Sequence, residues 1–445
     1  MGAQGAKVAA ALMLAAFAAL PAGSQPMPQD RVVTFDFPGV RIGTAENASG
    51  PTGATVFHFP KPVMAAVDVR GGSPATINTD ALRLSYDEPF VDAITFAGGS
   101  SYGLSVATGV AEALKAQRKD PGDWASIPFV AGAIIFDLGP RRFTSVTPDA
   151  ALGRAALAAA REGRFPIGAA GAGRFATQGG YFEARTYSGQ GASVRQAGAT
   201  KVAVFTVVNA LGHVVDRQGR VVRCAGPTPN ECGTIQERIA GKLRSKGALA
   251  GTAGGRGLTA NTTVTLVLTN QKLPLWALQR LAVQVHSSMA RAVQPYSTTN
   301  DGDVLFAATT AEVENADLPV EDLGLLASEA AWDAVLSSVP ALDPPPPAGR
   351  PPTLSELRRY TGRYEFAPGM DLDVMVRDGS MWVRGPRRAN LYLPSDGKDL
   401  QLTPVNASDF RIPGARGDWL RFDASGVTIN PGKWPVSARR ISGAR

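Results

Sequence analysis

The sequence predicts a large α/β domain followed by a small all-β domain. Apolar, β-branched runs alternate with segments of helical periodicity over most of the chain, a proline-rich break follows, and short alternating segments bounded by turns complete it. Alternating strands and helices build layered α/β folds, whereas closely spaced short strands build antiparallel barrels or sandwiches. A chain of 445 residues is long enough to hold both domains.

The strands of the large domain are predicted from runs whose length and β-branched composition suit buried strands. These runs are 62–69, 91–97, 201–208 and 262–268. Its helices are predicted from apolar periodicity over 104–116, 150–162 and 275–293. In the last of these, apolar residues that include Leu281, Val285 and Met289 form one stripe, which leaves Arg280 and Arg291 available to solvent.

A proline-rich segment, 342–352, predicts a stiff linker between a domain at 25–341 and a tail at 353–445. Turn signals in the tail at Asp378-Gly379 and Ser425-Gly426 separate short alternating segments. We therefore expect a small antiparallel β-barrel or sandwich there.

The first 24 residues predict a secretory signal peptide. Lys7 supplies a positive charge, residues 8–20 form an apolar run too short to span a bilayer, and Ser24 ends a small-residue cleavage site before Gln25. The alternative is an unstructured N-terminal segment. We expect an exported protein, periplasmic or secreted, without a membrane span.

Two cysteines, Cys224 and Cys232, lie close together in a Pro/Gly-rich segment. In an oxidising compartment they form either a short-loop disulfide or remain free thiols. A metal site is not expected, because two thiols alone make an incomplete ligand set.

The net charge of +7 is modest for this length, and most of it arises from 353–445, where 15 Lys/Arg face 10 Asp/Glu. No basic run is interleaved with aromatic residues in the sequence. Nucleic acid is therefore not an expected partner.

A candidate self-cleavage site lies where a glycine-rich segment, 251–257, leads into a buried strand at Asn261-Thr262. If the Thr262 hydroxyl attacks the Asn261 carbonyl, the peptide bond passes through an ester and hydrolyses. Thr262 then becomes a new N-terminus, whose Oγ1 is a nucleophile and whose α-amine, with an ordinary pKa of about 8, can act as the base. The alternative interpretation is a plain loop that enters a strand.

Short motifs in a fixed order accompany this site. They are Gly39-Val40-Arg41-Ile42-Gly43, Thr52-Gly53-Ala54-Thr55-Val56, Asp68-Val69-Arg70-Gly71-Gly72, Asp92-Ala93-Ile94, Gly98-Gly99-Ser100-Ser101-Tyr102-Gly103-Leu104, Ile134-Ile135-Phe136-Asp137-Leu138, Val207-Val208-Asn209-Ala210, Asn261-Thr262-Thr263 and Asn300-Asp301-Gly302-Asp303. Together they resemble the DmpA-type aminopeptidase and 6-aminohexanoate-oligomer hydrolase family. The resemblance implies a four-layer α-β-β-α sandwich of the N-terminal-nucleophile-like hydrolases, with the nucleophile at the start of a central strand.

The resemblance also implies roles for individual residues. Thr262 is the nucleophile, and the side-chain amide of Asn209 lies beside it and stabilises an oxyanion; by itself, an Asn after a strand indicates only a turn. Asp301 and Asp303 orient the nucleophile or bind the substrate amine, although Asp-Gly-Asp alone is ordinary turn chemistry. Alternating positions in an extended segment would point both carboxylates to one side.

The loop of Gly98, Gly99, Ser100, Ser101 and Tyr102 lacks the Lys and the spacing of a P-loop, and predicts a tight turn into a helix. In the family this loop lines the cleft, so its backbone N–H groups are expected to face the substrate. His58, His213 and His286 fit no triad and are interpreted as structural or surface residues.

Two departures from the family stand out. Phe136 occupies a position that commonly carries a Tyr, and the segment at Thr177, Gln178, Gly179 and Gly180 lacks the Lys of the aminohexanoate branch. The Lys-Gly-Gly segment is altered at 187–191 as well. We expect these losses to thin the polar network of the site, with altered specificity, slow turnover or inactivity as the outcome.

The sequence thus predicts an exported, self-processing hydrolase with an α chain at 25–261 and a β chain from Thr262, acting on short peptides or amides with a free amine through an acyl-Thr262 ester. The resemblance implies no metal or organic cofactor, and a homo-oligomer of αβ units. The alternatives are a catalytically impaired binding protein and an acyltransferase of the same fold. The tail, opening at Tyr360-Thr361-Gly362-Arg363-Tyr364-Glu365, resembles β domains appended to secreted β-lactamase-like hydrolases, where it would serve packing or substrate access.

Overall fold

The computed structural model describes residues 32–47, 52–84, 89–118, 126–138, 146–182, 185–224, 231–246, 261–341, 344, 346–367, 370–385, 397–413, 419–424, 426–429 and 436–441. The predicted signal segment and the glycine-rich segment 251–257 lie outside these residues, as does part of the predicted linker. No helix in the described part of the chain is both long and apolar enough to cross a membrane.

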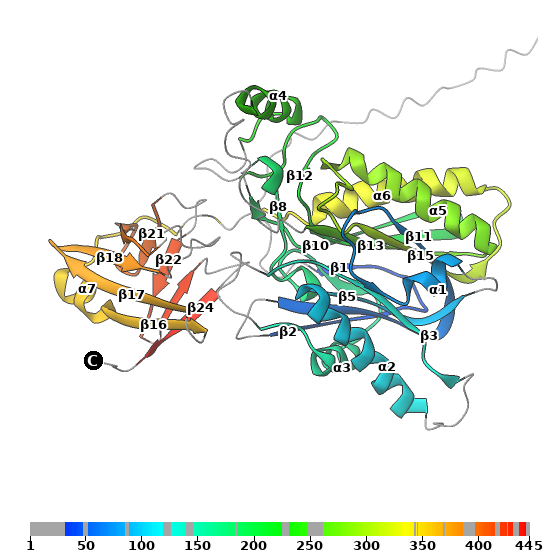
Figure 1. The fold of residues 1–445 in the computed structure, drawn as a ribbon, viewed down its shortest axis with the longest axis horizontal. Helices are drawn as coiled ribbons and strands as arrows, with labels where there is room; N and C mark the ends of the chain where they lie inside the picture. Colours follow the sequence, from blue (N-terminus) through cyan, green and yellow to red (C-terminus); the bar gives the residue numbers. More distant parts are fainter. Residues whose placement is uncertain are drawn as a thin grey trace, which may run out of the picture.

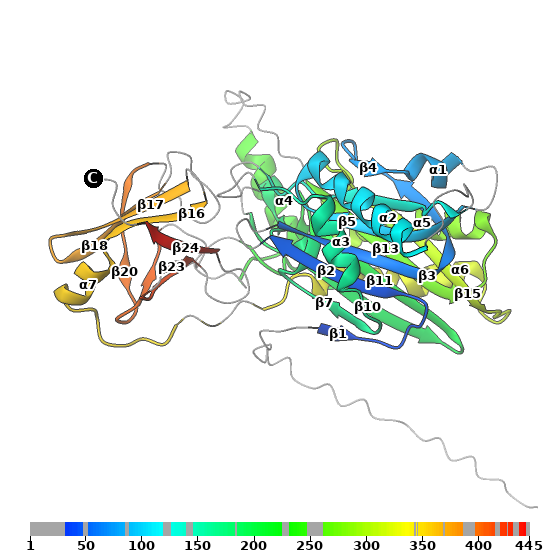
Figure 2. The ribbon, with the colours of Figure 1, turned by 90° about the horizontal axis from the view of Figure 1, so that it is seen from below.

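A mixed sheet forms the centre of the large domain (Figures 1 and 2). Among the described residues its strand order is β10-β11-β13-β15-β3-β5-β6-β4, with β2 also paired to β3. The bounds are β2 (Arg41–Asn47), β3 (Thr52–Val69), β4 (Thr76–Ile77), β5 (Phe90–Ala97), β6 (Val130–Ile134), β10 (Gln190–Ala197), β11 (Thr200–Asn209), β13 (Thr262–Gln271) and β15 (Val304–Val313). The first part of β3 pairs with β2 and its last part with β15, so this strand belongs to both halves of the sheet.

Helices cover the two outer faces, with α5 (Leu275–Ser288) and α6 (Val320–Ser337) on one side and α2 (Ser105–Arg118) and α3 (Ala150–Ala158) on the other (Figure 1). Each pair buries an apolar face against its half of the sheet. A third core lies between the halves, where the rings of Phe57, Phe96, Phe205 and Phe306 contact one another. The expected α-β-β-α sandwich is confirmed.

The alternation of side chains along β13 explains why this strand is central. Leu266 and Leu268 face the core between the sheet halves, while Val267 between them faces α5 and α6. Successive residues of a strand point to opposite faces, so a strand buried on both sides needs a continuous apolar run. The run at 262–268 therefore predicted both the strand and its burial correctly.

The predicted helix at 275–293 is too long. The helix α5 ends at Ser288, and a short 3₁₀ turn η6 (Met289–Arg291) follows. Val293 then pairs with Val214 in a ladder of two short strands, β12 (His213–Val214) and β14 (Val293–Gln294). The predicted helix at 150–162 also ends early, because the backbone of Arg161 pairs with Ile42. In both cases apolar periodicity continued into a strand contact that fixes the chain differently.

Short elements complete the large domain. They are β1 (Val32–Thr34), α1 (Thr79–Leu84), η1 (Ser100–Leu104), β7 (Arg164–Pro166), η4 (Gly171–Gly173), β8 (Thr177–Gln178), η5 (Gly180–Phe182), β9 (Thr186–Tyr187), β12 (His213–Val214), α4 (Ile235–Lys246) and β14 (Val293–Gln294).

The tail forms the expected small antiparallel β structure, and the helix α7 (Leu354–Tyr360) precedes its strands in the sequence. Its strands pair in the order β19-β18-β17-β16-β24-β23-β22-β21-β20 among the described residues. Their bounds are β16 (Gly362–Ala367), β17 (Met370–Arg377), β18 (Ser380–Arg384), β19 (Asp399–Gln401), β20 (Thr403–Pro404), β21 (Asp409–Arg411), β22 (Trp419–Phe422), β23 (Gly426–Ile429) and β24 (Val436–Ile441). Phe175 and Tyr187 of the large domain pack into its apolar core, so the two parts are in contact.

Candidate active site

The predicted nucleophile lies at the first position of a central strand. Thr262 begins β13, whose residues are all buried, and it lies opposite Asn209, the last residue of β11, in the antiparallel register of the two strands. The Thr262 hydroxyl donates to the Asn261 carbonyl oxygen over 2.5 Å. The hydroxyl is therefore beside the peptide bond that self-cleavage would break.

The carbonyl of Asn261 has a second donor. The backbone N–H of Gly302 donates to it over 2.7 Å. A fixed N–H aimed at a carbonyl under attack is the geometry of an oxyanion hole. A Cβ at residue 302 would lie 2.7 Å from the Thr262 hydroxyl and from the Ser73 carbonyl oxygen, so only glycine fits here.

Replacing Gly302 by alanine should slow self-cleavage by roughly 100-fold, because the added methyl group displaces both the oxyanion donor and the attacking hydroxyl. The rate is read from the appearance of the two fragments over time by mass spectrometry. Gly241→Ala is the matched control, since a Cβ there meets nothing within 4 Å. Cleavage of the Gly302→Ala chain at the rate of the control would contradict this role.

Asn209 is fully buried and held in one orientation. Its Oδ1 accepts from the backbone N–H of Thr177 over 3.1 Å, and its Nδ2 donates to the backbone carbonyl of Phe136 over 2.9 Å. Because Oδ1 is fixed by an N–H donor, the amide group of Asn209 is the end that faces other acceptors. The missing Tyr hydroxyl at Phe136 does not disturb this contact, since the backbone carbonyl makes it.

The two carboxyl groups near the predicted nucleophile do not lie in a solvated turn, since Asp301 is 2% and Asp303 1% exposed. Asp301 accepts from the hydroxyl and the backbone N–H of Thr298, at 2.7 and 2.9 Å. Asp303 accepts from the backbone N–H of Thr263 over 2.6 Å and of Ser297 over 2.9 Å. Both side chains are thus fixed beside the start of β13.

Burial controls the protonation of this pair. It raises the pKa of Asp301, and it raises the pKa of Asp303 to about 8, with the neighbouring Asp301 charge adding to the rise and the N–H donors of Thr263 and Ser297 opposing it. In the uncleaved chain Asp303 therefore keeps its proton over most of the neutral range. Cleavage would create an ammonium at Thr262, and a nearby positive charge lowers the pKa of a carboxyl group.

Asp303 should contribute a loss of stability to the uncleaved chain as pH rises. The folded pKa of Asp303, about 8, lies above the unfolded value of about 3.9, so between these values the folded state binds more protons and the free energy of unfolding falls with pH. The slope from this one group is at most about 1.4 kcal/mol per pH unit. Thermal melts of Thr262→Ala from about pH 5 to about pH 8 measure it, and adding Asp303→Asn should flatten the slope. Equal slopes in the two variants would contradict it.

Comparison with known proteins places this geometry in a family. Residues 33–342 match the sequence profile of peptidase family S58. The chain belongs to this family. A 6-aminohexanoate-oligomer endohydrolase of Paenarthrobacter ureafaciens is 40% identical over 318 residues, which cover 69% of this chain and 86% of that protein. An uncharacterized aminopeptidase of Mycobacterium tuberculosis is 32% identical over 337 residues, covering 71% and 95%.

A solved structure of a Pyrococcus horikoshii protein shares the fold, with a TM-score of 0.50 and 16% identity over 68% of this chain and 84% of that one. The resemblance to the aminopeptidase and aminohexanoate-oligomer hydrolase family is confirmed, and the S58 chain is a hydrolase of peptide or amide bonds. The β domain at 353–445 lies outside the matched residues.

In the glycine-serine loop, residues 98–102, three backbone N–H groups are hydrogen-bonded within the S58 chain. The N–H groups of Gly98 and Ser100 donate to the backbone carbonyls of Gly53 and Ile135, and that of Gly99 donates to the buried carboxylate of Asp137 over 2.7 Å. These three N–H groups therefore do not face a substrate, which corrects the expectation for them. Among the predicted residues of the loop, Ser101 and Tyr102 have exposed side chains, and their part in substrate binding stays a prediction.

The glycine-serine loop is linked to the site through Asp137, which accepts from the Gly99 N–H. Asp137 also accepts from the Thr52 hydroxyl over 2.7 Å, and a Cβ at Gly98 would collide with both side chains. Asp137 directly follows Phe136, whose carbonyl accepts from Asn209. The sequence motif contained Asp137, but no spacing rule assigned it this anchoring role.

Arg185 is a site residue that no sequence motif indicated. Its Nη1 donates to the Thr177 hydroxyl over 2.9 Å and to Oδ1 of Asn261 over 3.2 Å. A Cβ at Gly180 would overlap the guanidinium, so the cation lies over the segment that lacks the family Lys. The expectation of a thinned polar network therefore does not hold at Gly180, because the Arg185 guanidinium lies there. An arginine a few residues after the missing lysine was the available signal.

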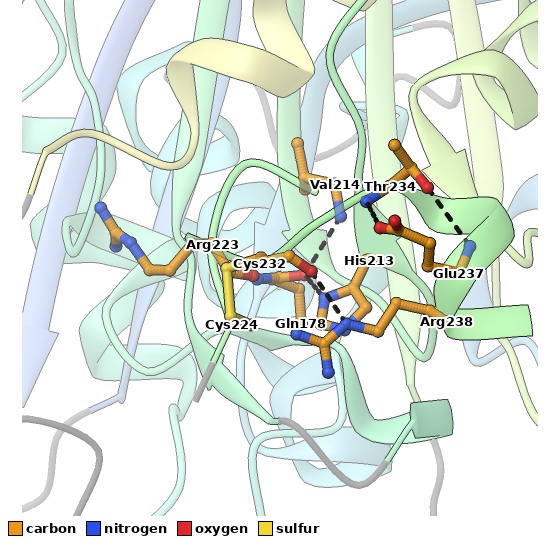
Figure 3. The surroundings of a disulfide bond; sticks show 9 residues. All are labelled: Gln178, His213, Val214, Arg223, Cys224, Cys232, Thr234, Glu237 and Arg238. Atoms are coloured by element: carbon orange, nitrogen blue, oxygen red, sulfur yellow. Dashed lines mark hydrogen bonds between the residues drawn. A yellow bond between two sulfur atoms is a disulfide. The ribbon is translucent and has the colours of Figure 1, made fainter. Parts of the chain in front are cut away.

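A disulfide braces the neighbouring segment (Figure 3). Cys224 and Cys232 are bonded, with their Cα atoms 5.7 Å apart. The carbonyl of Arg223, next to Cys224, accepts from Nε2 of Gln178 over 2.7 Å, and Oε1 of Gln178 lies 2.9 Å from Nδ1 of His213. The bond therefore fixes the chain one residue from Thr177, which holds Asn209. Burial lowers the pKa of His213 to about 4, so this histidine is neutral.

Proposed function

We propose that this chain is a self-processing aminopeptidase or amidase that acts through an acyl ester on Thr262. The observation that carries the proposal is the position of the Thr262 hydroxyl, 2.5 Å from an Asn261 carbonyl oxygen that also accepts the Gly302 N–H. Nucleophile and oxyanion donor thus meet at one peptide bond, at the start of a buried strand.

Self-cleavage follows from this contact. Oγ1 of Thr262 attacks the carbonyl carbon of Asn261, the bond to the Thr262 nitrogen breaks, and the hydroxyl proton passes to that nitrogen. The resulting ester between Asn261 and Thr262 is hydrolysed by water. This leaves a carboxylate on Asn261 and a free amine and hydroxyl on Thr262.

Substrate hydrolysis repeats the same chemistry. The α-amine of Thr262 takes the proton of Oγ1 as the hydroxyl attacks the substrate carbonyl, and the leaving amine departs with a proton. The N–H of Gly302 and the amide of Asn209 are the donors proposed for the oxyanion. Water then hydrolyses the acyl ester and restores Thr262. Asp303, bonded to the Thr263 N–H, holds the nucleophile in position.

The environment of Asn261 supports substrates with a free amine. Its backbone N–H donates to the Asn300 carbonyl over 3.1 Å, and Asn261 forms a parallel bridge with Asp301. When the precursor segment leaves, a substrate amine takes the place of this nitrogen. The carbonyl acceptor favours an ammonium there, and so would the amine-binding role proposed for the Asp301 carboxylate.

The test uses the processed protein with a leucyl anilide and its N-acetyl derivative. We expect hydrolysis of the free-amine substrate, and a decrease in kcat/KM of at least roughly 10-fold when the amine is blocked, since the blocked form loses a charged hydrogen bond. Equal rates on the two would contradict amine recognition. Hydrolysis of neither by the two-fragment protein would refute the proposed activity.

We further propose export of this protein. Lys7 and the apolar run at 8–20 support it, as does a disulfide between Cys224 and Cys232, a bond that persists in oxidising compartments. Assembly of αβ units into a homo-oligomer is likewise kept as a prediction from the family.

A further inference from the structure

We infer that Arg185 makes the acyl pocket selective for residues whose side chain carries a carbonyl or carboxylate oxygen, as in asparaginyl and aspartyl substrates. The inference rests on the proposed function, because it requires that the same threonine cleaves the chain and its substrates. The acyl residue of a substrate then occupies the place that Asn261 holds before cleavage. The position of Asn261 in the uncleaved chain therefore shows where the acyl residue of a substrate would bind.

Three of the contacts that Asn261 makes with described residues bear on specificity. The Asn261 nitrogen donates to the Asn300 carbonyl over 3.1 Å, and its carbonyl accepts from the Gly302 N–H over 2.7 Å. Its side-chain Oδ1 accepts from Nη1 of Arg185 over 3.2 Å. Any acyl residue can make the first two contacts through its amine and its scissile carbonyl. The third contact depends on the side chain, so it can set specificity.

Arg185 is fixed in this position by its neighbours. Its Nη1 also donates to the hydroxyl of Thr177, a buried residue whose N–H in turn holds Asn209. The absence of a side chain at Gly180 allows the guanidinium to lie over the backbone there. The cation is thus anchored to the same residues that orient the proposed oxyanion donor, rather than held loosely at the surface.

The chemistry of guanidinium gives the direction of the preference. Arginine carries only donors, and its charge does not titrate in the physiological range. The site around Asn261 is buried, with the Asn261 side chain fully covered. An acyl residue without an acceptor would leave the Arg185 donor without its Asn261 partner, and a cationic side chain would be repelled. Asparaginyl and aspartyl groups supply the acceptor at the observed distance from the backbone.

The first experiment compares asparaginyl and leucyl anilides, whose side chains have similar size and branching, on the processed enzyme. We expect kcat/KM to favour the asparaginyl substrate by roughly 10- to 100-fold, the effect of one hydrogen bond to a charged group. In Arg185→Met this ratio should fall toward one, and Arg185→Lys should retain part of it. Arg41→Met is the control and should leave the ratio unchanged, since Arg41 is exposed and pairs with Glu162.

A second readout needs no added substrate. Asn261→Leu should slow self-cleavage by roughly 10-fold or more in the wild-type background, and by much less in Arg185→Met, because the contact is already absent there. A variant that folds but cleaves slowly therefore still gives a rate for this comparison. Additive effects of the two substitutions would overturn the inference, as would a wild-type enzyme that prefers the leucyl anilide.

The two levels of the proposal fail differently. If the processed enzyme hydrolyses anilides without regard to the acyl side chain, the proposed function stands and the role of Arg185 is wrong. If no fragments form and no anilide is hydrolysed, the proposed function itself is wrong and this inference falls with it.

Discussion

Thr262→Ala should give a single uncleaved chain where the wild-type protein gives two fragments. Alanine removes the hydroxyl that lies beside the Asn261 carbonyl, so both self-cleavage and amide hydrolysis should be lost. Intact mass spectrometry and N-terminal sequencing decide the question. The wild-type β chain should begin with Thr262-Thr263-Val264.

Thr262→Ser is the matched control, since it keeps the hydroxyl and should still cleave. Fragments from Thr262→Ala would place the nucleophile elsewhere. A wild-type chain that stays intact under all conditions would refute self-processing, and the interpretation as a binding protein with an inactive hydrolase fold would then lead.

Asn209→Asp should lower kcat by roughly 100- to 1000-fold, the loss expected when one oxyanion donor is removed. The substitution keeps the size of the side chain and an oxygen for the Thr177 N–H, but it replaces the donor that faces the Phe136 carbonyl. Rates of fragment formation and of anilide hydrolysis should fall together, because both reactions use the same carbonyl position.

Asn270→Asp provides a control on the same sheet, at the other end of β13, where the Asn270 side chain bonds backbone groups of Ala199 and Lys201. Circular dichroism checks that both variants fold. A kcat for Asn209→Asp close to that of this control would show that its amide is not the oxyanion donor.

Sequence patterns located the strands and the start of β13 because those features depend on local composition. The β-branched run after Asn261 can only be buried on both faces, and it is. Burial of Asp301 and Asp303 was not readable, since Asp-Gly-Asp looks the same in a solvated turn and in a covered site. Their fixed donors come from Ser297, Thr298 and Thr263, whose side-by-side placement requires the folded chain.

The contacts of Gly302 and Arg185 escaped the sequence for a related reason. Gly302 acts through its backbone N–H, which leaves no trace in residue type beyond the need for a glycine. Arg185 reaches Asn261 across 76 positions of sequence, so no local spacing could connect them. The predicted end of the helix was wrong for the same reason. The helix α5 ends at Ser288, because strand pairing of Val293 overrides the apolar periodicity of the sequence.

In a cleaved chain, the central sheet would be built from strands of both fragments. β13 and β15 would belong to the new β chain, yet they lie between β11 and β3 of the α chain, with ladders on both sides. The two fragments of a cleaved chain would therefore be interleaved and stay together. Once separated by denaturation, they would have to rebuild the middle of a sheet by encounter of two molecules, a step that the uncut chain performs within itself. Cleavage would thus make assembly irreversible.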